Sequence, residues 1–266
     1  MRQYKKNTFA KASRLAVVFL GLCCAHLPSF LSSPANAQTE LDRRFELTPL
    51  LVFEQANNDV IVDGVSSPYM FGAAGVLGTA HLTDSVQVEV GLGYGFAPNQ
   101  PVSISSRSFK GDFKGVYKNM AFSVMPFQAG GYRVGLTIER ETQSMKSKNL
   151  VGFGSGASLV GSASSEQAAN KLGLRLQTKA LATLGAVAVQ MGMSDWTFRS
   201  DGVAQSDGGF PITKNISAQG KDPFFSVELT RDVGDLNVSI MFENQKRSFD
   251  VVNYINRIQI LATFSF

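Results

Sequence analysis

The C-terminal stretch Tyr254–Phe266 has the sequence YINRIQILATFSF, and its side chains alternate in polarity. Steps of two back from the end give an apolar row, which consists of Phe266, Phe264, Ala262, Ile260 and Ile258. The row between them is polar apart from one leucine, and consists of Ser265, Thr263, Leu261, Gln259 and Arg257. A period of two places alternate side chains on opposite faces of a β-strand. The stretch therefore predicts a strand with an apolar medium on one face and a polar medium on the other.

A final strand that alternates in this way and ends on phenylalanine resembles the C-terminal assembly signal of bacterial outer-membrane β-barrel proteins. The resemblance implies recognition by the barrel-assembly machinery of a Gram-negative bacterium through Tyr254, Ile258, Ile260, Phe264 and Phe266. A second, shorter resemblance lies in MPF at residues 125–127 and GGYRV at residues 130–134, which are similar to a hairpin of some outer-membrane barrels. Together these features imply the small OmpA, OmpX and OmpW type of barrel, and they imply no particular activity.

The N-terminal residues 1–37 have the pattern of a cleaved secretory signal peptide. Five basic residues and no acidic residue precede an apolar run from Leu15 to about Leu31, and the small-residue motif ANA follows at residues 35–37. A membrane anchor is the alternative, but a spanning helix needs roughly 20 apolar residues, and a histidine, a proline and a serine interrupt this run. Residues 38–266 are therefore expected to form the mature domain.

Cleavage after Ala37 removes five of the 25 basic residues, none of the 21 acidic residues and both cysteines. The mature chain then has 20 basic and 21 acidic residues, a formal net charge of −1. This charge gives no reason to expect a nucleic-acid partner. Without cysteine, the mature chain has no disulfide and no thiolate for metal binding or nucleophilic catalysis. Nothing in the sequence indicates a cofactor.

The mature chain contains ten alternating segments and no apolar run long enough for a membrane helix. The segments are 45–54, 68–80, 85–96, 116–127, 132–143, 172–180, 185–198, 222–232, 236–247 and 253–266. The clearest is 85–96, in which every second side chain is aliphatic or aromatic. In 68–80 we expect Tyr69, Phe71 and Leu77 on the outer face. In a bilayer, a closed barrel is the remaining way to pair every backbone polar group.

The links between these segments alternate in length. Short links follow the second, fourth, sixth and eighth segments, and longer polar links follow the first, third, fifth and seventh. Short periplasmic turns and longer extracellular loops are typical of outer-membrane barrels. The prediction is therefore an all-β fold: a single antiparallel transmembrane β-barrel of about ten strands, with eight or twelve as alternatives.

This prediction places the protein in the bacterial outer membrane, with both mature termini in the periplasm. Outer-membrane lipid and lipopolysaccharide are then its expected surroundings. Small solutes or surface ligands are expected to meet it at four loops, which are 55–67, 97–115, 144–171 and 199–221.

The inner rows of the predicted barrel contain most of the strand charges, which are Glu46, Glu54, Glu89, Arg133, Glu139, Glu141, Arg175, Lys179, Glu228, Glu243 and Arg257. The outer rows contain charges only toward strand ends, at Lys118, Arg140 and Arg231, as expected because a charge in mid-membrane is costly. Side chains nearly fill a barrel of about eight strands, so we expect paired charges rather than a wide selective pore. A loop centred near residue 250 predicts contact between Glu243 and Arg257.

The mature chain has one histidine, His81, in a short link that is expected to be periplasmic. The family resemblance implies that enzymes of this class act near the outer rim, so His81 does not favour catalysis. Neither glycine-rich run, 91–95 or 152–156, opens a helix as a phosphate-binding loop does, and no metal-ligand cluster stands out. The sequence therefore predicts a structural, surface-contact or small-solute permeability (porin-like) role without catalysis. The alternatives are a surface enzyme acting on lipid or peptide, and a soluble periplasmic ligand-binding barrel with its apolar rows inward.

Overall fold

The computed structural model describes residues 45–58, 69–104, 107–153, 159–178, 185–206, 211–233, 236–249 and 252–264. Its ten strands are β1 (Phe45–Asn58), β2 (Tyr69–Thr83), β3 (Val86–Ile104), β4 (Arg107–Ala129), β5 (Tyr132–Phe153), β6 (Leu159–Thr178), β7 (Ala186–Ser206), β8 (Ile212–Val233), β9 (Leu236–Phe249) and β10 (Val252–Phe264). Among these described residues, no helix is long and apolar enough to cross a membrane. The predicted signal peptide, residues 1–37, lies outside them.

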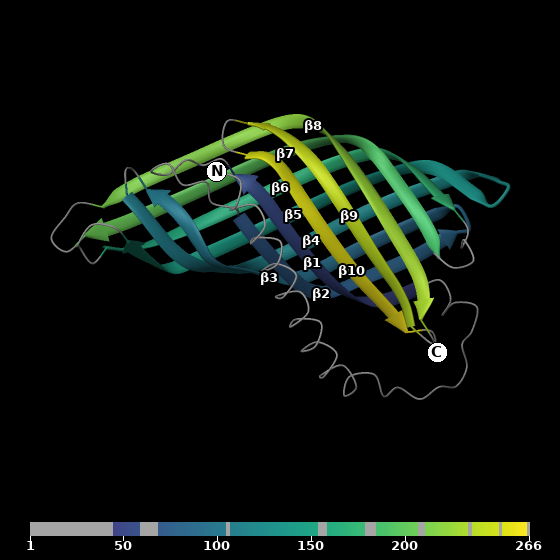
Figure 1. The fold of residues 1–266 in the computed structure, drawn as a ribbon, viewed down its shortest axis with the longest axis horizontal. Helices are drawn as coiled ribbons and strands as arrows, with labels where there is room; N and C mark the ends of the chain where they lie inside the picture. The colour runs from purple at the N-terminus through teal and green to yellow at the C-terminus, as the bar shows by residue number, and fades with distance from the viewer. Residues whose placement is uncertain are drawn as a thin grey trace, which may run out of the picture. The chain divides into compact units, whose positions relative to one another are not determined.

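Every strand pairs antiparallel with its neighbours in sequence, and β1 also pairs with β10, which closes the sheet into a barrel (Figure 1). At this seam Leu50 lies opposite Leu261, and Glu54 lies opposite Arg257. Closure pairs the backbone groups that a sheet edge would otherwise leave exposed. The predicted all-β fold, antiparallel order and number of ten strands are confirmed.

Six consecutive strands, β3 to β8, are much longer than the other four. They have 19 to 23 residues each, whereas β1, β2, β9 and β10 have 13 to 15. In Figure 1 the long strands continue to the left, past the ends of β9 and β10. We call this end of the barrel the extended end. The opposite end, where short links join β2 to β3 and β4 to β5, is the turn end.

Strand pairing continues through most of three predicted loops, so the predictions for 97–115, 144–171 and 199–221 are wrong over most of their length. Ile104 remains paired with Arg107, and Val151 remains paired with Val160. The glycine, serine and alanine residues of these stretches are typical of loops, but they also fit strands whose outer face meets water and whose inner face is crowded. The loop 55–67 belongs to β1 at its start, and its remainder lies outside the described residues.

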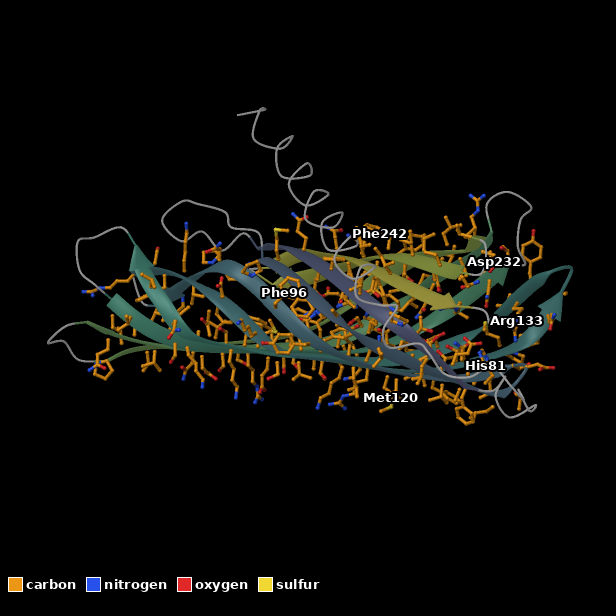
Figure 2. The ribbon with its side chains drawn as sticks, turned by 90° about the horizontal axis from the view of Figure 1, so that it is seen from below. His81, Phe96, Met120, Arg133, Asp232 and Phe242 are labelled. Carbon is orange, nitrogen blue, oxygen red and sulfur yellow. The ribbon has the colours of Figure 1, made fainter. Side chains whose placement is uncertain are left out.

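At the turn end, the short link predicted after the fourth segment is a tight glycine turn. Gly130 and Gly131 join β4 to β5 with φ angles of 57° and 88°. Glycine adopts this left-handed conformation without the steric cost of a side chain. Figure 2 shows His81, Arg133 and Asp232 together at this end of the barrel.

Large apolar side chains cover the outside of the barrel between the turn end and its middle. Leu136 and Leu174 are 52% and 57% exposed, and Figure 2 shows Met120 and Phe242 pointing outward from opposite sides. We call this surface the apolar belt; from β1 to β10 it includes Leu47, Val76, Leu92, Met120, Leu136, Leu174, Met191, Phe225, Ile240 and Ile258. A soluble monomer rarely exposes so continuous an apolar surface.

On eight strands the first outward position beyond this belt, toward the extended end, is polar. This polar ring consists of Gln55, Lys118, Arg140, Asn170, Asp195, Lys221, Asn244 and Asn256. Several members face each other across strand pairs: Asn170 lies opposite Asp195, and Asn244 donates a 2.7 Å hydrogen bond to Asn256. The ring therefore marks the boundary between apolar and aqueous surroundings.

Beyond the ring the polarity of the barrel wall is reversed. On β4, Lys110, Asp112 and Lys114 point outward, while Phe109 and Phe113 are buried inside. We call the packed interior of the extended end the apolar plug; it consists of Ile104, Phe109, Phe113, Met145, Leu150, Ala163 and Ala204, each at most 6% exposed. The extended end is thus filled by its own apolar side chains.

The faces predicted for the second segment are wrong. Phe71 and Leu77 point into the barrel, are 3% and 4% exposed, and lie opposite Glu54 and Thr48 of β1. Both faces of β2 are apolar or small, so alternation alone does not fix which face is outward. The side chain of Tyr69 is outside the described part of the structure.

Candidate functional site in the barrel interior

Six charged side chains meet inside the barrel at the level of the polar ring. This central network consists of Glu54 (β1), Glu139 and Glu141 (β5), Lys171 (β6), Glu243 (β9) and Arg257 (β10). Each member is adjacent in sequence to a ring residue, as Arg257 is to Asn256. Because side chains alternate along a strand, the residue next to an outward ring position must point inward.

Arg257 binds carboxylates from three other strands. Its Nη2 donates to Glu54 Oε2 at 2.9 Å, and its Nη1 donates to Glu141 Oε2. Its Nη1 also lies 3.6 Å from Glu243 Oε1, the residue directly opposite it on β9, as the predicted register requires. The fixed fork of a guanidinium suits it to several carboxylates at once.

Lys171 is the second cation of the central network, and its side chain is completely buried. Its Nζ donates to both carboxylate oxygens of Glu243 at 2.7 Å. The same atom lies 3.3 Å from Glu141 Oε2 and 3.4 Å from Glu139 Oε1. Lysine is almost never fully buried unless it is paired. Here the paired lysine joins β6 to β5 and β9.

The central network has four carboxylates and two cations, and neutral amides supply further hydrogen-bond donors. Gln143 Nε2 donates to Glu54 Oε2 at 2.8 Å, and Asn119 Nδ2 donates to Glu139 Oε1 at 3.1 Å. Burial removes the water that would otherwise hydrate a carboxylate, and hydrogen-bond donors of the protein replace that water. The amides therefore stabilise the acidic side of the network.

Some contacts of the central network join neighbouring strands, and others cross the barrel interior. Arg257 and Glu141 join β10 to β5, Lys171 and Glu243 join β6 to β9, and Gln143 reaches Glu54 on β1. None of these pairs of strands are neighbours in the sheet. At most 3% of each side chain is exposed for Lys171, Arg257, Glu54, Glu141 and Glu243, so they fill the interior instead of lining open water.

A second, smaller charged group lies nearer the turn end. Arg175 Nη2 donates to Glu228 Oε2 at 2.5 Å, and Ser239 Oγ donates to Glu228 Oε1 at 2.5 Å. Glu89 accepts a 2.6 Å hydrogen bond from Gln87. The side chains of Arg175 and Glu228 are 22% and 18% exposed, so this group is more open to solvent than the central network.

Two of the other inward charges expected from the sequence, Glu46 and Arg133, lie at the turn end. Glu46 is exposed there, with one carboxylate oxygen 3.6 Å from Nε2 of His81. Arg133 is half-buried beside the glycine turn, and Lys179 lies outside the described residues. Within the described residues, no group of three histidine, cysteine, aspartate or glutamate side chains could hold a metal ion.

Sequence reasoning missed Lys171, the most deeply buried cation. It ended a stretch that was predicted to be a loop, although β6 in fact runs from Leu159 to Thr178. The usable signal was the row Leu172, Leu174 and Leu176, whose period of two extends backwards to place Lys171 on the inner face.

The proposed assembly signal is described only in part. Ile258 is 45% exposed on the outer face and Ile260 is half-buried. The side chains of Tyr254 and Phe264, and the whole of Phe266, lie outside the described part of the chain. Recognition of these residues by the assembly machinery stays a prediction.

No protein-family model and no curated protein sequence matches this chain. It is similar to the translocator domain of the autotransporter NalP from Neisseria meningitidis, at 10% identity and a TM-score of 0.45 over 97% of this chain and 98% of that one. It is also similar to the outer membrane protease OmpT from Escherichia coli, at 9% identity and a TM-score of 0.40 over 88% and 100%. A major outer membrane protein from Thermus thermophilus matches at 10% identity and a TM-score of 0.38 over 83% and 99%.

These likenesses say nothing about activity, and the architecture follows from the chain itself. The sheet is closed, its outer face has a belt of exposed apolar side chains, and its inner face holds the buried charges. A closed sheet with its apolar side outward fits a bilayer and not water. The chain has the architecture of a bacterial outer-membrane β-barrel protein.

Proposed function

We propose that the protein is a closed, non-catalytic outer-membrane barrel that serves envelope structure or surface contact and does not conduct solutes. One observation supports this proposal above the others: the side chains of the central network join strands on opposite sides of the interior. Lys171 and Arg257 bind acids across the barrel, and their side chains are 0% and 2% exposed. A small solute would have to break these ion pairs in order to pass.

The apolar plug forms a second barrier beyond the central network. Ile104, Phe109 and Leu150 are completely buried inside the extended end. An ion passing through this region would lose its hydration without gaining polar partners. A polar network and an apolar plug in series therefore oppose both charged and apolar solutes.

The extended end supports a role in surface contact. Its six strands continue beyond the polar ring as a paired sheet with a polar outer face. A paired sheet holds its exposed side chains in fixed positions, and ordering them on binding costs less than ordering a flexible loop. We propose that this end faces the cell exterior and that the turn end, where β1 starts and β10 ends, faces the periplasm.

Solute passage is tested by liposome swelling with the purified, refolded barrel. We expect liposomes containing the protein to swell in isotonic sugar or amino-acid solutions no faster than empty liposomes. A general porin reconstituted in parallel provides the positive control, and heat-modifiable migration on a gel shows that the barrel is folded. Swelling faster than that of empty liposomes, at a rate that falls as the solute becomes larger, would refute the closed interior.

The orientation is tested by cysteine labelling in intact cells. The two natural cysteines lie within the predicted signal peptide, so the mature chain offers no competing thiol. We expect Lys148→Cys, exposed at the extended end, to react with a membrane-impermeant maleimide added outside. Asp84→Cys at the turn end is the matched control and should react only after the outer membrane is permeabilised. The reverse pattern would place the extended end in the periplasm.

The structure offers no specific support for catalysis. Among the described residues the only histidine is His81, which lies at the turn end with Glu46 nearby. We therefore propose no second function for the barrel.

A further inference from the structure

Four basic side chains gather on the outer face of β4 and β5, just beyond the apolar belt. We call Lys114, Lys118, Arg140 and Lys146 the basic patch; all four are exposed. None of them has a carboxylate within ion-pair distance among the described residues. The patch is therefore a concentration of positive charge that the barrel does not neutralise itself.

The strand register brings these like charges together. Lys114 lies directly opposite Lys146. Lys118 lies opposite Thr142, only two residues along β5 from Arg140. Like charges directly opposite each other on antiparallel strands destabilise a sheet. An anion bound between these side chains would relieve the repulsion.

Two other cations on the outer surface beyond the belt do have acidic residues opposite them. Lys221 lies opposite Asp195, and Arg199 lies opposite Glu166. Asp112, the nearest acid on β4, instead accepts a 2.8 Å hydrogen bond from the backbone of Asn99. On the far side of the barrel the polar ring is neutral. Among the described residues beyond the belt toward the extended end, the exposed cations without an acid opposite them thus lie on β4 and β5.

The surroundings of the basic patch match a lipid rather than a free ion. Val116, between Lys114 and Lys118 on the same face, lies opposite Tyr94, and the two are 44% and 57% exposed. Met120 and Ile138 continue this apolar surface into the belt. Basic groups beside an apolar wall can bind a phosphate head group and its acyl chains together.

We propose that the basic patch binds a lipid of the adjacent leaflet through phosphate groups on its head group. Lys114 and Lys146 hold one phosphate, Lys118 and Arg140 hold a second, and the acyl chains lie along Met120, Ile138 and the belt below them. This inference rests on the proposed insertion of the barrel in the outer membrane. A glycolipid with two phosphates and several acyl chains has the matching chemistry.

The test measures lipid retention by the refolded barrel in neutral detergent, using native mass spectrometry. The probe is diphosphoryl lipid A, and the comparison ligands are the same glycolipid without its phosphates and inorganic phosphate alone. Each basic residue near a membrane surface contributes about 1 kcal/mol toward an anionic lipid, so the double variant Lys114→Gln with Lys146→Gln should bind about 30-fold more weakly. Removing the phosphates from the lipid should weaken binding at least as much.

The matched control is the double variant Arg199→Gln with Lys221→Gln, which loses the same charge where acids lie opposite. It should retain diphosphoryl lipid A like the wild type. A second variant, Lys118→Gln with Arg140→Gln, tests the other half of the patch. Equal loss in the control, equal binding of the dephosphorylated lipid, or displacement by inorganic phosphate at matched concentration would overturn the proposal. Lipid retention is measured in detergent and does not depend on whether the barrel conducts solutes. A negative result on lipid binding therefore leaves the proposed closed interior untouched.

Discussion

Replacing Arg257 with methionine is expected to lower the free energy of unfolding by about 3–5 kcal/mol. The substitution removes the cation that binds Glu54 and Glu141 and leaves both carboxylates buried without it. An uncompensated buried charge costs far more than the net value of an exposed pair. Equilibrium unfolding in urea, with the barrel in phospholipid vesicles, measures the change. Trp196, the only tryptophan, is 1% exposed and reports unfolding by fluorescence.

The control for Arg257 is Lys118→Met, which removes a cation from the exposed outer face. That substitution should change stability by no more than about 0.5 kcal/mol, as is usual for surface positions. Equal effects for the two variants would show that Arg257 has no special role in the interior. They would also remove the main support for a filled barrel.

Replacing Leu174 with arginine is expected to lower the free energy of unfolding from the membrane by about 2–4 kcal/mol. Leu174 is 57% exposed in the apolar belt on β6, so the new charge would face lipid. Arginine at Asn170, four residues along the same outer row, should cost about 0–1 kcal/mol, because that position belongs to the polar ring. The same urea titration in vesicles measures both variants.

A soluble barrel would give a different pattern for this pair. In water, arginine at an exposed leucine is nearly neutral, and the two positions would give equal effects. A difference between Leu174 and Asn170 therefore locates the edge of the membrane on β6. Equal and small effects would contradict insertion of the belt in a bilayer.

The fold was largely predictable because two different solvents impose a clear alternation on each strand. Val90, Leu92 and Tyr94 of β3 and Ile258 of β10 lie on the outer face as expected, and the ten strands are antiparallel. Charges on the outer rows, such as Lys118 and Arg140, lie at the edge of the belt, where lipid no longer penalises them.

The extent of the long strands was not predictable from alternation. Beyond the polar ring the outer face meets water and the inner face meets the apolar plug. Glycine, serine and alanine are tolerated on both of these faces, so the sequence there does not alternate clearly. Ala163 and Ala204 are buried there although their neighbours in sequence are typical of a loop. Lys171 was missed for the same reason. The two faces of β2 were predicted in reverse. Phe71 and Leu77 alternate with small residues, which fit either face of the sheet.

The partners across the barrel were also beyond sequence reasoning. Register between neighbouring strands predicted that Arg257 and Glu243 lie opposite each other, and they do. The shorter contacts of Arg257, with Glu54 and Glu141, depend on closure of the sheet and on the width of the barrel. Lys171 and Glu243 meet across the interior for the same reason. Pairwise alternation contains no information about that width.

Recording from single barrels in a planar lipid bilayer tests the central claim, a closed interior, most directly. The central network and the apolar plug predict no stepwise conductance for the folded wild-type protein under an applied voltage in concentrated salt. Folding is verified on the same sample by heat-modifiable migration and by Trp196 fluorescence. Reproducible conductance steps from the folded wild type would contradict the closed interior, and their ion selectivity would then assign the central network to a pore.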